Sequence, residues 1–393
     1  MKTGYAFGRA SLDADIDDPG AAAWLSEFLC PWAEPIQAGR GDVLVRFDAF
    51  SGAWDALARR RLAPAPSAFP CFALDSRVVC LPGWPEAGST VVVDEEFDCF
   101  YRVANRAVHI VARPGCRRAR LGLMRTVREI LVSRALDGGT LLDLHAAAFA
   151  AGGRAVLLAG AKNAGKTTLL IHALASGHAD FVANDRVFVS VDGNAAIAIG
   201  VPTIVSVRPW TAAAFPALQG DGLSHAPTLS VGEDPPEGSG GAASAPVGLP
   251  NGAAWSPAQF THRLRVARAR GGTVHAVVLP VIDPEVSTWA LEPLAPAKAE
   301  ALLGACLYGA SSHPRPRTIF EAAGAAGLDA ERRALMVRTL AAGAPCVSLR
   351  LGPDAYRESA AGWLRALGLA AGPGIADPPQ DLARERGRTR PPG

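Results

Sequence analysis

Lysine is scarce in this chain. Arginine supplies most of its 39 basic residues, and only four are lysines: Lys2, Lys162, Lys166 and Lys298. Long apolar runs are missing as well, and none reaches the roughly 20 residues that a membrane-spanning helix needs. Residues 1–13 are polar and lack an apolar core, so we expect no signal peptide. These absences predict a cytoplasmic protein with no membrane partner.

A strong charge of one sign and any cysteine motif are also absent. The formal net charge of +2 argues against a general nucleic-acid-binding surface. The seven cysteines are scattered and form no C-x-x-C pair, which favours free thiols and disfavours a zinc site. With 393 residues and 49% hydrophobic content, the chain is expected to form one large or two ordinary domains around a sizeable core.

The composition and periodicity predict three segments. Residues 1–115 are expected to form a smaller β-rich α+β region, with a helix at 21–29 and strands at 42–47, 78–81, 90–93, 98–103 and 107–112. We place turns between the later strands at Gly83, Gly88 and Asn105. Residues 116–371 are expected to form the larger region. Residues 372–393 are polar and rich in proline, which predicts a disordered tail.

The larger region reads as alternating helices and strands. It opens with an amphipathic helix at 117–136, which has Leu121, Met124 and Val127 on one face and Arg125 and Glu129 on others. The remaining helices are expected at 168–176, 296–308, 330–341 and 357–367, and the strands at 141–149, 154–159, 181–189, 201–207, 274–281 and 346–351. The glycine pair at 152–153 predicts a tight hairpin turn. Residues 216–256 have few large apolar side chains and are expected to form a mobile loop.

One nine-residue segment carries a complete phosphate-binding pattern, G-x-x-x-x-G-K-[ST]. It consists of Gly160, Ala161, Lys162, Asn163, Ala164, Gly165, Lys166, Thr167 and Thr168. The expected strand at 154–159 precedes it and an expected helix follows it, which is the context that the pattern needs. Backbone N–H groups of such a loop bind phosphates at a helix N-terminus. Lys166 would then reach the outer phosphates, and the Thr167 hydroxyl would ligate Mg²⁺.

Asp185 is the strongest candidate outside this loop. It lies in an apolar strand only 18 residues after Thr167, one helix and one turn away. A carboxylate on the neighbouring strand can face the same phosphates and hold Mg²⁺ near the Thr167 hydroxyl. The alternative is a structural aspartate at a strand end.

Two further residues have weaker signals. His145 lies in an apolar strand, where it is either a hydrogen-bonded core residue or a member of the site. Arg208 ends an expected strand and could pair with phosphate oxygens or an acidic substrate. A basic run is interpreted as a solvated helix face: Arg263, Arg265, Arg268 and Arg270.

Taken together, the spaced motifs resemble the catalytic domain of bacterial HPr kinase/phosphorylase. The resemblance rests on Leu144-His145, the loop at 160–168, the Ser-Gly-His turn at 176–178 and the strand at 182–187. It covers residues 139–210 well and 273–370 loosely, and the first 115 residues do not match. Related kinases include those that phosphorylate a serine of lasso-peptide precursors.

The resemblance implies a phosphoenolpyruvate-carboxykinase-like core with a mixed sheet, and it implies ATP and Mg²⁺. By position, Lys166 matches the phosphate-binding lysine, Thr167 the metal-binding hydroxyl residue and His145 the strand histidine. Asp185 matches the second of two family aspartates. Asn184 replaces the first, the usual general base, so base catalysis would fall to Asp185 or His145, or be dispensable. A family glutamate is replaced by Ser206.

These expectations define an ATP-dependent kinase that transfers the γ-phosphoryl group to a hydroxyl acceptor. The acceptor would be a serine of a peptide or protein, or a small metabolite, and homo-oligomerisation is left open. The alternative is an ATP-binding module, or pseudokinase, without phosphoryl transfer, which Asn184 and Ser206 motivate.

Overall fold

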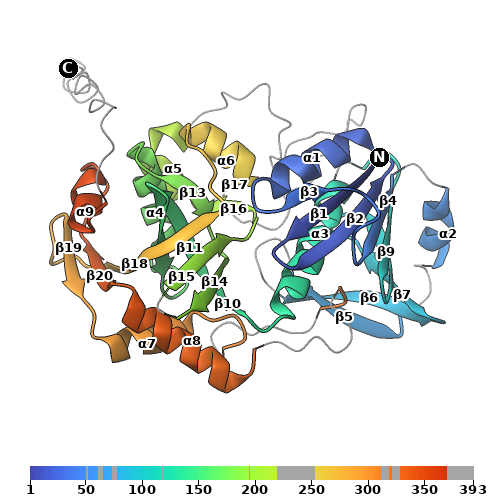
Figure 1. Cartoon of the computed structure of the whole chain (residues 1–393). Coiled ribbons are helices and arrows are strands. Elements are labelled where there is room, and N and C mark those ends of the chain that lie inside the picture. The colour runs from blue at the N-terminus through green and yellow to red at the C-terminus, as the bar shows by residue number, and fades with distance from the viewer. Residues whose placement is uncertain are drawn as a thin grey trace, which may run out of the picture.

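The chain folds as a mixed α/β protein with two large sheets and flanking helices (Figure 1). The computed structural model describes residues 1–49, 52–60, 65–72, 78–116, 118–193, 195–218, 253–310, 318–320 and 328–369. The expected tail at 372–393 and most of the expected loop at 216–256 lie outside these residues. None of the described helices is long and apolar enough to cross a membrane.

The first sheet has nine described strands in the order β3-β1-β2-β4-β9-β8-β7-β6-β5. Their bounds are Lys2–Phe7 (β1), Ala10–Ile16 (β2), Glu34–Ile36 (β3), Leu44–Asp48 (β4), Ser67–Phe72 (β5), Val78–Glu86 (β6), Ser89–Asp94 (β7), Cys99–Ala104 (β8) and Ala107–Ala112 (β9). The β-rich character expected of this region is confirmed. The turn expected at Gly83 is wrong, because Gly83 lies inside β6, where a Cβ would come within 2.6 Å of the Val91 carbonyl oxygen.

The second sheet carries the phosphate-loop segment. Its main order is β10-β14-β15-β18-β12-β11-β13, and β20 pairs with β18 and β19. The bounds are Leu141–Leu144 (β10), Ala146–Ala151 (β11), Arg154–Ala159 (β12), Asp180–Ala183 (β13), Val187–Asp192 (β14), Ala195–Gly200 (β15), Gly271–Ile282 (β18), Trp289–Pro293 (β19) and Cys346–Leu351 (β20). Gly152 and Gly153 both have positive φ and close the expected hairpin between β11 and β12.

Helices cover both faces of the second sheet (Figure 1). The described helices are Pro19–Leu29 (α1), Ala53–Arg60 (α2), Ala119–Leu136 (α3), Lys166–Ala175 (α4), Pro209–Ala214 (α5), Pro257–Leu264 (α6), Pro296–Ala305 (α7), Ala330–Gly343 (α8) and Ala361–Ala366 (α9). α4 packs on β11 and β12, and α8 packs on β10, β14 and β15. Along β12, Val156 and Leu158 belong to the cluster on the α4 face, while Leu157 belongs to the cluster with α7 and α8. This alternation is the period of two expected for a strand covered on both faces.

Several predicted boundaries are wrong. The strand expected at 201–207 is confined to Val205–Val207 (β16), which pairs with Ala253–Trp255 (β17). β17 and the short 3-10 helix Pro216–Leu218 are ordered ends of the segment expected to be a mobile loop. The last helix is shorter than expected, since it begins at Ala361. The basic run is not one helix face, because α6 ends at Leu264.

α3 is not amphipathic as expected. Arg125 and Glu129 are buried together with the apolar residues of the helix. Sheet strands and α1 cover the helix on several sides, since it contacts β1, β2, β9 and β10. The Arg125 guanidinium donates to the Asp94 carboxylate and to the Tyr101 hydroxyl, so its charge is paired inside the core. α3 therefore packs mainly on the first sheet, although its sequence assigned it to the second region.

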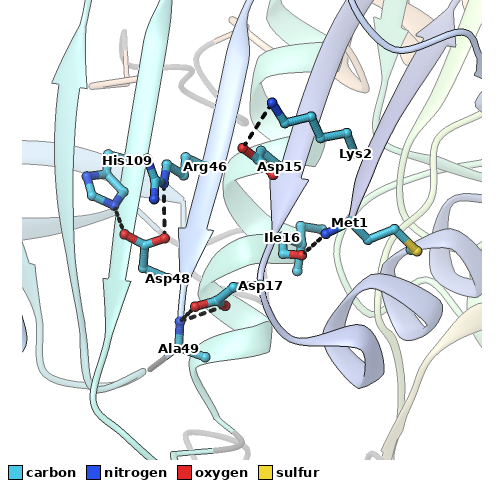
Figure 2. A network of polar contacts seen from close by, with 9 residues as sticks. All are labelled: Met1, Lys2, Asp15, Ile16, Asp17, Arg46, Asp48, Ala49 and His109. Carbon is cyan, nitrogen blue, oxygen red and sulfur yellow. Dashed lines mark hydrogen bonds and ion pairs between the residues drawn. The ribbon is translucent and has the colours of Figure 1, made fainter. Parts of the chain in front are cut away.

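Polar contacts hold the parallel strands β4 and β9 together (Figure 2). Asp48 accepts a hydrogen bond from Arg46 Nε at 3.0 Å and lies 2.5 Å from His109 Nε2. Just beyond β2, the Asp17 carboxylate accepts the Ala49 N–H, with N···O distances of 2.8 and 3.0 Å. These carboxylates serve the first sheet and do not belong to the phosphate-loop region.

The two sheets share one hydrophobic core. Trp32 is fully buried, and its indole N–H donates to the Val182 carbonyl at 2.9 Å, next to the end of β13. Gly200 lies against the same indole, and a Cβ there would fall 2.3 Å from Trp32 Nε1. After α6, Arg268 donates to the Glu27 and Cys30 carbonyl oxygens at the end of α1. The end of α1 and the turn that follows it therefore pack against β13, the strand that leads to Asp185.

Replacing Trp32 tests this junction. We expect Trp32→Ala to lower the free energy of unfolding by about 3–5 kcal/mol, because it removes a large buried side chain. Trp32→Phe keeps most of the packing but leaves the Val182 carbonyl without its donor, which costs about 1–3 kcal/mol. Denaturant unfolding measures both. Trp54→Phe, at the far end of the first sheet, is the control, and an equal effect there would contradict the assigned role of Trp32.

Candidate functional site

The segment 160–168 forms a loop whose backbone requires its glycines. Gly160 and Gly165 have φ of 149° and 93°, and Asn163 between them has φ of 73°. Residues other than glycine and asparagine rarely adopt such angles. The loop joins β12 directly to α4, as its pattern predicts. Ala161, Lys162 and Asn163 are exposed, so the crest of the loop is open to a ligand.

Strand register brings the predicted site residues to one edge of the sheet. Ala146, the first residue of β11, pairs with Ala159, the last residue of β12, so His145 lies beside the start of the loop. β13 is antiparallel to β11, with Ala183 opposite Ala148. Asp185 therefore leaves the sheet at the edge where the loop begins.

His145 and Asp185 are in contact. His145 Nε2 lies 3.4 Å from Asp185 Oδ1. Tyr308 completes the group: its hydroxyl donates to Asp185 Oδ2 at 3.3 Å, and its ring stacks on the His145 ring at 5.8 Å between centroids. The three side chains come from segments that are far apart in the sequence. They form a carboxylate–imidazole–phenol cluster next to the loop.

A buried ion pair supports this cluster from below. Arg186 donates two hydrogen bonds to Asp143, Nε to Oδ1 at 2.9 Å and Nη2 to Oδ2 at 2.6 Å. Burial opposes the charge of Arg186, but the carboxylate outweighs it and raises the pKa of the guanidinium above its ordinary value. The Arg186 guanidinium also lies 4.9 Å from the centroid of the Tyr308 ring. The pair thus fixes the residue after Asp185 and the ring that contacts Asp185.

Lys166 lies over the loop and is buried. Its ammonium donates to the carbonyl oxygens of Gly160 at 2.8 Å and Ala161 at 3.0 Å. Burial lowers the pKa of Lys166, and the negative charge of Asp185 partly offsets that effect. A partly desolvated cation would gain strongly from a bound anion. This is the electrostatic character of a phosphate site.

Arg208 and Thr168 connect the loop to α5. The Arg208 guanidinium donates to Asn163 Oδ1 at the crest of the loop. Thr168 Oγ1 lies 3.1 Å from the Thr211 hydroxyl oxygen. Arg208 therefore lies at the loop, where it was predicted to pair with phosphate oxygens. Its guanidinium could leave the Asn163 amide oxygen and bind a phosphate oxygen instead.

Thr167 and Asp185 are the residues that could hold a magnesium ion bound together with a nucleotide. Thr167 lies half-buried in the first turn of α4, and Asp185 lies at the neighbouring strand end. No group of three or more His, Cys, Asp or Glu side chains suited to a metal occurs among the described residues. Mg²⁺ commonly takes one or two carboxylates and completes its shell with phosphate oxygens and water. The chain would supply the Thr167 hydroxyl and the Asp185 carboxylate.

Two continuous strands expected around the site are broken. The expected strand 141–149 divides at His145, whose N–H donates to the Cys306 carbonyl at 2.7 Å as the chain changes its pairing partner from β14 to β12. The expected strand 181–189 divides at residues 184–186, between β13 and β14. Both breaks therefore fall at predicted site residues, His145 in the first and Asp185 in the second.

Asn184 lies in the second break and is buried. Its side chain is 6% exposed, and among the described residues its Oδ1 has no hydrogen-bond partner. A buried, unpaired amide oxygen costs about 1–3 kcal/mol. It can accept a hydrogen bond from a ligand hydroxyl, but it cannot remove a proton.

Sequence reasoning missed Tyr308 and the loop neighbour Cys306. Both follow α7, and no motif surrounds them. Burial raises the pKa of the Cys306 thiol, while the Gly160 backbone and the Lys166 charge oppose that shift. The thiol is therefore protonated and unreactive at neutral pH. The segment reaches the site through the bridge between Leu144 and Leu307 and through backbone hydrogen bonds on either side of it, and no local pattern in the sequence announces these contacts.

A cavity of about 480 Å³ lies elsewhere, between α1 and α6. Arg268 lines it, but its guanidinium already serves the α1 carbonyls. The side chains that the sequence predicts for the site gather at the loop, and the loop is therefore the candidate site. No known protein-family model matches the chain, and no curated protein matches it.

Breaking the buried pair tests the support of the site. We expect Asp143→Asn to lower the free energy of unfolding by about 3–5 kcal/mol, because Arg186 stays charged and loses its counter-ion. The matched control is Glu300→Gln, which removes the partly exposed partner of the exposed Arg338 and should cost less than about 1 kcal/mol. Urea unfolding of both variants provides the comparison. Equal stability of the two would show that the pair does not stabilise the fold.

Proposed function

We propose that this protein is an ATP-dependent kinase that transfers a phosphoryl group to a hydroxyl acceptor. The observation that carries the proposal is the convergence of a complete phosphate loop with Asp185 and His145 at one sheet edge. Phosphoryl transfer needs mainly positioning and charge stabilisation, and this arrangement offers both.

Each residue has a role that follows from its place. The loop N–H groups and Lys166 would bind the outer phosphates, and Arg208 would move from Asn163 to a phosphate oxygen. When bound between Thr167 and Asp185, Mg²⁺ would neutralise charge on the phosphates. His145, held by Tyr308 and Asp185, would orient the acceptor hydroxyl.

The likeness to HPr kinase/phosphorylase supports the same proposal. A mixed sheet, a loop between β12 and α4 and a histidine before β11 agree with a phosphoenolpyruvate-carboxykinase-like core. We propose that core for the part of residues 116–371 that follows α3, because α3 packs mainly on the first sheet. The proposal names the acceptor as a class, a hydroxyl group on a peptide, a protein or a small molecule.

One observation favours a second candidate, an ATP-binding module without transfer. Asn184 stands in the position of the family's general base, and its buried oxygen cannot accept a proton. The kinase remains the preferred proposal, because His145 and Asp185 lie beside the loop and can bind the acceptor hydroxyl without that base.

Nucleotide binding is tested through Lys166. We expect Mg·ATP to raise the melting temperature of the wild type and to have little effect on Lys166→Met. Without ligand, the free energy of unfolding of Lys166→Met should not fall below that of the wild type. Burial lowers the pKa of Lys166, so a charged lysine at this position disfavours folding. Relative to the variant, the wild type should become more stable as pH rises from the lowered pKa of folded Lys166 towards about 10.5, the pKa of an unfolded lysine, because the unfolded state binds more protons in this range. No shift of the wild type at millimolar Mg·ATP would refute nucleotide binding.

Transfer is tested at residues 184 and 185. Asp185→Asn should reduce ATP turnover by several orders of magnitude, because the metal loses its carboxylate ligand. Asn184→Asp should be tolerated and could raise turnover by at most the roughly 10²–10⁴-fold of a positioned base. Single-turnover assays with ATP measure both variants, and circular dichroism controls for folding. Full turnover in Asp185→Asn would refute the metal role of Asp185. If the wild type and both variants bind ATP but show no turnover, the ATP-binding module without transfer would be favoured.

A further inference from the structure

The side of the loop away from Asp185 has its own set of side chains. β12 lies between β11 and β18 in the sheet, and β20 follows β18. His145 and Asp185 lie on the β11 and β13 side. β18 runs parallel to β12, so its last residues reach the edge where the loop begins, and a Cβ on Gly160 would lie 3.9 Å from Pro280 Cδ.

Two side chains from this side reach the second loop glycine. A Cβ on Gly165 would lie 3.6 Å from Ile282 Cδ1 and 3.8 Å from the Tyr356 hydroxyl oxygen. Ile282 ends β18 and is 61% exposed, which is unusual for a large aliphatic side chain at a strand end. Tyr356 lies in the turn that follows β20.

The Tyr356 hydroxyl is buried and, among the described residues, has no hydrogen-bond partner. Burial raises the pKa of Tyr356 to about 12, so the group is a proton donor at neutral pH. The ring is held in place by His172 of α4 at 5.4 Å and by Phe215 at 6.1 Å between centroids. His172 Nε2 lies 2.8 Å from the Glu358 carbonyl oxygen, and this contact holds the turn that contains Tyr356. An unpaired donor is therefore held rigidly beside the phosphate loop.

We propose that Ile282 and Tyr356 bind the nucleoside of the nucleotide. This inference rests on the proposed function, which places the terminal phosphate towards Asp185 and His145. The nucleoside is at the opposite end of the triphosphate, so it must leave the loop on the β18 and β20 side. Ile282 offers an apolar surface for the base, and the Tyr356 hydroxyl can donate to a ring nitrogen or a ribose oxygen.

The test compares Mg·ATP with Mg·tripolyphosphate, which has the same phosphate chain but no nucleoside. Isothermal titration calorimetry of the full chain gives both affinities. We expect the wild type to bind ATP at least about tenfold more tightly than tripolyphosphate. Ile282→Ala and Tyr356→Phe should each weaken ATP binding about threefold to tenfold and leave tripolyphosphate binding unchanged. Leu335→Ala, an exposed leucine of α8, is the matched control and should change neither affinity.

The outcomes separate this inference from the proposed function. Equal wild-type affinities for the two ligands, or variants that weaken both ligands alike, would overturn the nucleoside site and leave phosphate binding intact. Unchanged ATP affinity in both variants would overturn it as well. A wild type that binds neither ligand would overturn the proposed function and this inference together.

Discussion

The buried ion pair between Arg186 and Asp143 is the interaction on which the site depends. It joins the end of β10 to the start of β14, directly after Asp185. Two buried charges are stable only when they are paired with good geometry, and this pair makes two parallel hydrogen bonds. The Tyr308 backbone N–H also donates to the Asp143 carbonyl at 2.9 Å. Asp143 thus anchors Arg186, the residue after Asp185, through its side chain, and it anchors Tyr308, which contacts Asp185, through its backbone.

The first sheet acts on the site through packing. Trp32 donates to Val182, two residues before Asn184, and the close approach is possible because residue 200 has no side chain. A dense core transmits strain rather than absorbing it, so a change at this junction would move the strand end that presents Asp185. The first sheet can therefore stabilise the position of Asp185 by packing alone, whether or not it binds a ligand itself.

The candidate site carries several features that disfavour the free protein. Burial lowers the pKa of Lys166 and so disfavours its charged form. Asn184 and Tyr356 each have a buried oxygen without a partner among the described residues, and Asn163 has positive φ. Each feature costs free energy that a bound phosphate, hydroxyl or nucleoside would recover. Such features collect at functional sites, because the surrounding fold holds them in place. They support the proposal that the site binds an anionic ligand together with a hydroxyl-bearing partner.

The sequence alone determined the loop and most elements, because these depend on local rules. The glycines at 160 and 165, the hairpin at 152–153 and the buried strand β12 follow from φ preferences and periodicity. Asp185 was predicted from its spacing after the loop, His145 from its strand and the family resemblance, and Arg208 from its place at a strand end. His145 contacts Asp185, and Arg208 contacts the loop. Tertiary structure decided the rest. Tyr308 reaches Asp185 across 123 residues, α3 buries charges that its periodicity placed outside, and two strands break where the chain changes pairing partner. Such contacts depend on which strands become neighbours, and no local pattern in the sequence encodes that choice.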